Sequence, residues 1–510
     1  MLNSNLEIIR QWERILAEKC SSWIEENKEE VFLVDPIDGK EISAHYGATH
    51  TAIALMIFGQ RNDDDSMYCL GRKLLSSILN RWDYCSALQD FHFDFNNFAL
   101  CIIEDLLPED DSLVERIKSV VLKTPDSNHD TINWLPMRAF VNKKRHEWTG
   151  LQKYLDAMNC CLSKVMKATN DDGGVEDRLP KGSSFNLQYD IATVCCLQFL
   201  CVHGVEKDLS RELGFLLNAV APDGDINYQG RGANQVFAWS CWIYLLSSSG
   251  RETDLMQALR FLDGKLEKML SHNNLLLNNE PGCEKRLWWD YHHASVYISH
   301  LFLWLVLAEI DYGRRSIEPV IVCDGSTGLD IYKAKDFFVA VFNGRREYLA
   351  ERGPVITAVW TKKEGMVFKG SFGPWQGLFG NDYCSEESVL YNYWGPLEVH
   401  QNIDWHRNRW IRKFLANRPI IAKITSKPRF SAIEVKSESA DCIDIIFTVP
   451  SHCCINLPVF NSSHYTPKVY EDGNEVSVSK PLLIVNQYGE LSVYRTKPSD
   501  RKTVNVRIRK

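Results

Sequence analysis

The stretch "APDGDINYQGRGANQVFAWSCWIYLL", residues 221–246, changes character halfway along its length. Its first part holds glycines, two aspartates, a tyrosine and an arginine, and its second part is an almost uncharged run of aromatic and aliphatic residues. A segment that is apolar on nearly every side predicts a helix buried all round. We therefore expect a polar loop that leads into the N-terminal end of a buried helix.

The same pattern of polar loop and low-charge helix recurs along the first three hundred residues. The segments are 45–59, 92–107, 130–141, 185–200, 232–246 and 291–308, and the fifth of them is the helix of the opening stretch. They begin roughly 40 to 60 residues apart, which is the length of one helical hairpin with its loops. The spacing predicts six hairpins, each with one buried helix.

Amphipathic helices lie between these segments. Residues 4–26 place Leu6, Ile9 and Trp12 on one apolar stripe, and 67–81, 113–123, 153–166 and 253–272 follow the same period. Capping-box spacing predicts helix starts at Ser4, Ser112 and Thr149, since each has Glu or Gln three residues later. Helices with one solvent-exposed face thus alternate with helices that are buried all round. This alternation predicts two concentric layers of helices, which form an N-terminal (α/α) toroid.

The period changes after about Ile317. Segments such as "DFFVAVFNG", "LLIVNQYGELSVYR" and "VNVRIRK" alternate or run in β-branched residues, with turn signals between them. This pattern predicts a C-terminal antiparallel β-sandwich. We expect a multidomain α and β protein with the toroid at residues 1–312 and the sandwich at residues 313–510.

Composition limits the classes of function. The 510 residues carry a net charge of −8, which gives no general attraction to nucleic acid or to an anionic membrane. The N-terminus has no apolar signal-peptide core, and the most apolar run falls short of the roughly 20 residues that a membrane span needs. We expect a cytoplasmic protein whose 16 cysteines are free thiols.

Motifs for cofactor chemistry are missing from the sequence. It contains no P-loop, no HExxH, no GxSxG and no CxxC, and the glycines of "YQGRGANQ" follow no predicted strand. We therefore expect no cofactor and no metal. The remaining candidates act through side chains alone.

The loops at the expected toroid mouth hold aromatic, amide and cationic residues together. They are His45, His50, His92, Asn96, Asn97, Asn133, Trp134, Arg178, Lys181, Asn186, Gln188, Tyr189, Asp223, Asp225, Tyr228, Arg231, Asn234, Gln235, Trp288, Trp289, His292 and His293. Sugar rings stack on aromatic faces, while hydroxyl and carboxylate groups need planar donors. This mixture favours a glycan ligand, and the cations Arg178, Lys181 and Arg231 favour an anionic one.

At this point the chain resembles the heparinase II/III-like and alginate or chondroitin lyases, a group of polysaccharide lyases. The resemblance rests on the toroid followed by a sandwich and on "PDGDINYQGRGANQVFAW", in which Asp-Gly, a tyrosine and polar residues open an inner helix. The Asn-Asn-His triplet typical of these lyases is here "FNNFAL", with Phe98 in the histidine's place, or alternatively "FNLQY" at Asn186. The resemblance implies β-elimination on a uronate-containing glycan.

Such an elimination needs three roles in one cavity. Hydrogen bonds or positive charge must neutralise the uronate carboxylate, and Asn186, Asn97, Gln235 and Arg231 are the candidates. A base and an acid must then move protons, and a tyrosine serves if a nearby cation lowers its pKa. We expect catalysis by Tyr228 with Arg231 beside it, His293, Asn186 and Tyr189. We expect substrate binding by Asn97, Trp134, Arg178, Asn234, Gln235, Trp289, His400 and His406.

The resemblance also implies that the sandwich lends residues to the cleft, which makes His400, His406, Tyr391 and Tyr393 candidates. An interface between the two domains would explain the same residues. The expected partner is an anionic oligosaccharide or polysaccharide, with no nucleic acid and no membrane.

Two other functions fit the sequence. A glycoside hydrolase on the same toroid would use two carboxylates ~5 to 9.5 Å apart, and Asp172, Glu176, Asp177, Asp223 and Asp225 supply candidates. A non-catalytic protein of glycan binding or polysaccharide assembly would need none of these proton carriers.

Overall fold

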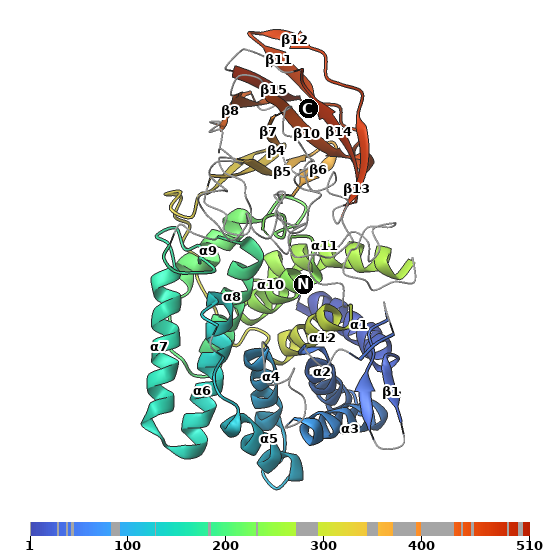
Figure 1. The fold of residues 1–510 in the computed structure, drawn as a ribbon, viewed down its shortest axis with the longest axis vertical. Helices are drawn as coiled ribbons and strands as arrows, with labels where there is room; N and C mark the ends of the chain where they lie inside the picture. Colours follow the sequence, from blue (N-terminus) through green and yellow to red (C-terminus); the bar gives the residue numbers. More distant parts are fainter. Residues whose placement is uncertain are drawn as a thin grey trace, which may run out of the picture.

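The computed structural model describes residues 2–509, except 28–29, 37–38, 42–44, 83–91, 128, 182–184, 231–232, 272–293, 344–354, 371–393, 399–432, 440–441, 450–452, 487–488 and 498–502. Its helices occupy the first part of the chain and its long strands the last part. Figure 1 shows the C-terminal strands gathered at one end of the long axis, beyond the helices.

The buried helices close into a ring. Within the described residues they are α2 (Gly47–Arg61), α4 (Phe93–Leu106), α6 (Leu135–Thr149), α8 (Leu187–Val202), α10 (Val236–Ser248) and α12 (Ala294–Ile310). Each contacts the next in this order, and α12 returns to contact α2. Every described residue of α10 and nearly all of α12 are buried, as their low charge predicts. All six predicted inner helices are confirmed.

The amphipathic helices form the outer layer. They are α1 (Leu2–Ser21), α3 (Asp65–Arg81), α5 (Ser112–Lys123), α7 (Gln152–Ala168), α9 (Ser210–Ala219) and α11 (Glu252–Ser271). Each outer helix packs against an inner one, and α1 also contacts α11, so that the outer layer closes where the chain begins. A short pair of strands, β1 (Ile24–Glu26) and β2 (Val31–Leu33), follows α1. The fold is an (α/α) toroid.

The predicted capping boxes are wrong, although the helices are right. α1 already includes Ser4, and the cap of α5 is Asp111, whose carboxylate accepts a hydrogen bond from the amide of Leu113. Thr149 ends α6, and its hydroxyl donates to the carbonyl of Arg145. At α5 a neighbouring side chain therefore took the capping position, whereas α7 begins after Leu151 without a side-chain cap.

The C-terminal strands form three antiparallel sheets. One has the order β3 (Leu329–Ala334), β4 (Phe337–Phe342), β5 (Val355–Thr361), β6 (Gly365–Lys369). A second has the order β13 (Leu482–Asn486), β14 (Gly489–Arg495), β10 (Cys453–Phe460), β7 (Gly395–Glu398). The third has the order β12 (Asn474–Val476), β11 (Lys468–Glu471), β15 (Thr503–Arg509), β9 (Cys442–Thr448), β8 (Ile433–Ser439).

Side chains from all three sheets share one hydrophobic core, as packed antiparallel layers require. The strand β4 is buried on both faces. Val339 and its alternate neighbours face this core, whereas Phe338, Ala340 and Phe342 belong to the core of the toroid. The second domain is therefore seated directly on the first through β4.

None of the described helices is both long and apolar enough to cross a membrane. The described cysteines of the inner ring, among them Cys195, Cys196 and Cys241, are free thiols.

Candidate active site

A pocket opens where the N-terminal ends of the inner helices meet. Its volume is about 260 Å³. Among the described residues it is lined by His45, Tyr46, His92, Phe95, His129, Thr131, Asn133, Trp134, Arg178, Gln188, Tyr189, Phe237 and Tyr297. Each inner helix contributes, either by its first turn or by the residues just before it. The leading ends of the six helices share one cavity, as predicted, but Tyr228, which was expected to lie in it, is not among the described lining residues.

Aromatic rings build much of the wall. Tyr46, at the start of α2, stacks on Phe95 of α4 with ring centroids 4.4 Å apart, and Phe95 meets Trp134 edge to face at 5.8 Å. On the side of α10 and α12, Phe237 and Tyr297 contact each other at 6.1 Å. Flat apolar faces beside polar groups are the surfaces on which sugar rings bind.

Two histidines lie against each other in this wall. The rings of His45 and His92 have centroids 4.3 Å apart, and His92 also lies 6.0 Å from Trp134. Both histidines precede inner helices, and the backbone carbonyl of His92 accepts the first helical hydrogen bond of α4 from Asn96. The start of the helix thus sets the position of the imidazole.

Arg178 is held between two of the inner helices. The carbonyl of the preceding Asp177 accepts a hydrogen bond from the amide of Ile132, in the short helix η1 (Ile132–Trp134) before α6. Glu176 pairs with Phe185 in a β-bridge just ahead of α8. These contacts bring Arg178 to the same cavity as Trp134 and Tyr189.

Tyr189 lies in the first turn of α8 and is partly exposed. Asn186 caps this helix, because its side-chain oxygen accepts a hydrogen bond from the amide of Gln188 at 3.1 Å. Helix capping therefore fixes the turn that carries both Gln188 and Tyr189 into the pocket.

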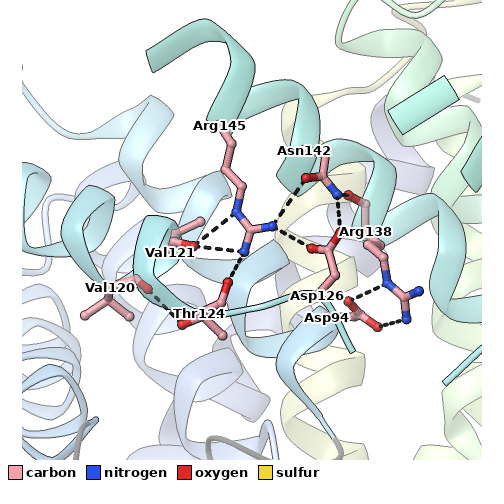
Figure 2. Close-up of polar contacts among 8 residues, drawn as sticks. All are labelled: Asp94, Val120, Val121, Thr124, Asp126, Arg138, Asn142 and Arg145. Carbon is pink, nitrogen blue, oxygen red and sulfur yellow. Dashed lines mark hydrogen bonds and ion pairs between the residues drawn. The ribbon is translucent and has the colours of Figure 1, made fainter. Parts of the chain in front are cut away.

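A buried network of ion pairs and hydrogen bonds supports the segment before α6, which carries the lining residues His129 and Thr131 (Figure 2). Arg138 of α6 forms a double hydrogen bond with Asp94 of α4 and also donates to the backbone carbonyl of His129 at 2.7 Å. Arg145, about two turns further along α6, donates to the carbonyls of Val121 and Thr124 at the end of α5. The network ties the segment that carries His129 and Thr131 to α4, α5 and α6.

Two buried histidines lie beneath the aromatic wall. His50 lies 4.7 Å from Tyr46, and the rings of His50 and His300 are 5.3 Å apart. Burial lowers the pKa of His50 to about 3 and lowers that of His300 well below its usual value. Both are neutral at physiological pH, so neither adds charge below the pocket.

The described lining of the pocket contains one arginine, Arg178, and no lysine. The N-terminal end of a helix carries roughly half a positive charge, and the ends of the inner helices converge here. None of the described lining residues is an aspartate or a glutamate. Such a cavity favours an anionic group.

The structure corrects the role expected for Tyr228. Its side chain has no exposed surface, and its hydroxyl donates a 2.7 Å hydrogen bond to the backbone carbonyl of Ala219. Burial, together with nearby Asp225, raises the pKa of Tyr228 well above its usual value. A tyrosine sealed in this way cannot reach a substrate, so the proton carrier expected here is wrong.

Four other predicted residues also lie in the framework and not on the pocket lining. Asn186 is the helix cap described above, and Gly230 packs so closely against it that a Cβ at residue 230 would lie 2.4 Å from its oxygen. Asn97, Asn234 and Gln235 are buried. Gln235 accepts a hydrogen bond from Gln188 at 3.0 Å, so it lies behind a lining residue. None of the four is among the described lining residues, so their expected roles stay predictions.

Of the residues expected to act in catalysis or substrate binding, Tyr189, Trp134 and Arg178 line the pocket. Four other residues expected at the toroid mouth also line it: His45, His92, Asn133 and Gln188. The others, Arg231, His293, Trp289, His400 and His406, lie outside the described residues, as do Tyr391 and Tyr393. Sequence reasoning missed Tyr46, Phe95, His129, Thr131, Phe237 and Tyr297. Most of these are aromatic residues in or next to the first turn of an inner helix, and that position was the available signal.

In the described parts of the chain, no three His, Cys, Asp or Glu side chains are grouped to hold a metal ion.

No protein-family model and no curated protein matches the sequence. Solved structures do resemble the fold. The α-1,6-mannanase GH76A of Salegentibacter sp. HEL1_6 is 12% identical, with 59% of this chain and 99% of the mannanase covered and a TM-score of 0.42. An unsaturated glucuronyl hydrolase of Streptococcus agalactiae is 16% identical, with 60% and 91% covered and a TM-score of 0.42. A polysaccharide lyase is 14% identical, with 52% and 89% covered and a TM-score of 0.37. All three are enzymes that act on glycans.

Proposed function

We propose that this protein is a lyase that cleaves a uronate-containing oligosaccharide or polysaccharide by β-elimination in the toroid pocket. One observation carries the proposal: the lining combines Arg178, Tyr189 and a histidine pair with aromatic rings, and its described residues include no carboxylate. The heparinase II/III-like lyases remain the family whose chemistry this proposal follows.

Each chemical role has a candidate in the pocket. Arg178 neutralises the uronate carboxylate, assisted by the converging helix ends, and so makes the C5 proton acidic enough to remove. Tyr189 or one of the histidines His45 and His92 takes that proton. As the C4–C5 double bond forms, the bond from C4 to the glycosidic oxygen breaks and a second proton carrier protonates the leaving oxygen. No water is consumed.

A hydrolase would need a different lining. Both retaining and inverting enzymes use a pair of carboxylic acids on either side of the glycosidic bond. None of the five carboxylates considered for this role is among the described lining residues. Asp172, Glu176, Asp177 and Asp225 are buried, and Asp223 is partly exposed. Asp225 is also held in an ion pair with Lys369. These contacts favour elimination over hydrolysis.

The test is a panel of uronate-containing polysaccharides and oligosaccharides, followed by ultraviolet absorbance and by a reducing-end assay. The unsaturated uronate made by elimination absorbs in the far ultraviolet, whereas hydrolysis gives reducing ends alone. We expect wild type to produce the chromophore. We expect Arg178→Ala and Tyr189→Phe each to lower turnover by about 10²-fold or more, as removal of a charge-stabilising or proton-transfer group does.

The controls separate the alternatives. Lys181→Ala removes a nearby cation that is not among the described lining residues and should leave turnover close to wild type. Reducing ends without the chromophore would establish a hydrolase. Saturable glycan binding with neither product would establish a binding protein, and full activity in both pocket variants would remove this pocket from the mechanism.

A further inference from the structure

One buried ion pair joins the β-domain to the toroid. Lys369, the last residue of β6, places its Nζ 2.6 Å from a carboxylate oxygen of Asp225, in the loop before α10. The two side chains are 3% and 1% exposed. The ammonium also lies 5.5 Å from the ring of Trp239 and 5.8 Å from that of Phe261. Two charges removed from water at this depth are tolerated only where their pairing is close.

Asp225 organises the loop that carries it. Its second carboxylate oxygen accepts hydrogen bonds from the backbone amide of Asn227 at 2.8 Å and from the indole of Trp239 at 3.2 Å. A carboxylate can accept several bonds at once, so Asp225 connects β6, the loop and the first turn of α10. We call residues 221–230 and 233–235 the coupling loop.

The coupling loop continues to the pocket wall. Asn227 donates to the backbone carbonyl of Gln235 at 2.8 Å, and the side-chain oxygen of Gln235 accepts from Gln188 at 3.0 Å. A second link runs from Gln229, whose side-chain oxygen accepts the amide of Leu187 at 2.8 Å. Both links end on the first turn of α8, where Gln188 and Tyr189 enter the pocket.

We propose that Lys369 is a positioning residue: its ion pair with Asp225 holds the coupling loop, and through the loop the first turn of α8, in the conformation that places Gln188 and Tyr189 in the pocket. The β-domain thereby influences the pocket indirectly, through the coupling loop that packs behind the lining residues of α8. The expected effect on turnover rests on the proposed lyase function, whereas the effect on the loop does not.

The experiment compares the full-length chain with Lys369→Met, which keeps most of the side-chain volume and removes the charge. Hydrogen exchange measured on peptides covering 185–190 and 221–230 reports the loop directly, because the amide of Leu187 is bonded to it. We expect faster exchange in both peptides. We also expect kcat on the uronate substrate to fall by about 10- to 100-fold with a smaller change in KM, since misplacing a reacting group lowers the rate more than binding.

Two further variants keep the test decisive. Asp225→Asn/Lys369→Met removes both buried charges and so folds even if the single variant does not; its exchange should also be faster than that of wild type. Arg507→Met breaks the ion pair with Asp444 between β15 and β9 inside the sandwich and should leave both peptides unchanged.

The outcomes divide cleanly. Unchanged exchange in both peptides, or an equal rise across all toroid helices, would overturn the positioning role. Faster exchange together with a wild type that turns over no uronate would refute the lyase function and leave the positioning role standing. Wild-type kcat in Lys369→Met, with Tyr189→Phe inactive, would refute positioning and leave the lyase function standing.

Discussion

At the scale of single residues, two tyrosines of the same toroid have opposite environments. Tyr189 is partly exposed in the pocket, whereas Tyr228 is fully buried and bonded to a backbone carbonyl. Their phenol groups are chemically identical, so the surroundings alone decide which one can exchange a proton with a substrate. Tyr228 stabilises the coupling loop, where its ring also meets Phe338 of β4 at 5.8 Å.

Tyr228→Phe tests this assignment. Removing the hydroxyl leaves the buried carbonyl of Ala219 without this donor, so the free energy of unfolding should fall by about 1–3 kcal/mol. Turnover at saturating substrate should stay within about twofold of wild type, because the group does not reach the pocket. Urea unfolding and steady-state kinetics on the same preparation check both statements. A rate loss as large as that of Tyr189→Phe would return Tyr228 to the mechanism.

At the scale of helices, a charged cluster joins the beginning and the end of the toroid. Glu13 of α1 lies 3.5 Å from Arg61 at the end of α2, and Arg10 pairs with Glu309 of α12 at 2.7 Å. Arg61 also pairs with Glu309. Burial raises the pKa of Glu13 to about 7, although Arg61 opposes the shift. We therefore expect the stability of the toroid to depend on pH.

Glu13 makes the stability of the toroid fall as pH rises. Its pKa is higher in the folded state than the ordinary 4.5, so the folded state binds the proton more tightly. The resulting stabilisation is complete below pH 4.5 and is lost as pH rises through about 7, by on the order of 3 kcal/mol. Urea unfolding of wild type and Glu13→Gln at several pH values between 5 and 8 measures the difference.

As pH rises, we expect the free energy of unfolding of Glu13→Gln to increase relative to that of wild type, because glutamine does not titrate. Glu7→Gln, an exposed position on the same helix, serves as the matched control and should follow wild type. Parallel pH curves for wild type and Glu13→Gln would show that Glu13 does not titrate in this range.

At the scale of the whole molecule, β4 contributes side chains to the hydrophobic cores of both domains. Phe338 has no exposed surface and packs into the toroid core, while the adjacent Val339 packs into the core of the sheets. Alternate residues of a strand face opposite sides, so a single strand serves both cores. The ion pair between Lys369 and Asp225 crosses the same boundary.

Phe338→Ala should therefore destabilise the entire chain. A Phe to Ala change in a packed core costs about 3–5 kcal/mol. We expect calorimetry to show one transition for wild type and one transition at lower temperature for the variant. Val339→Ala, on the other face of β4, should lower the same transition. Two separate transitions, with only one of them shifted by each variant, would show that the domains unfold independently.

The layered architecture could be predicted from the sequence. All six inner helices and the change from helical to strand periodicity were predicted correctly, because burial on all sides and burial on one face leave different local patterns. Buried and amphipathic helices alternate along the chain, and this alternation predicted that the N-terminal ends of the buried helices meet. Trp134, Arg178 and Tyr189 were placed in the pocket for the same reason: they precede or begin inner helices.

Which polar residues of the mouth are open to a ligand was decided only by tertiary structure. The loop "APDGDINYQGRGANQ" has the composition of a catalytic loop, yet contacts with Ala219, Asn186 and Lys369 occupy Tyr228, Gly230 and Asp225. Lys369 lies 144 residues away from its partner along the chain. Periodicity reports how much of a helix is buried, but the accessibility of one side chain depends on segments that are distant in sequence and pack beside it.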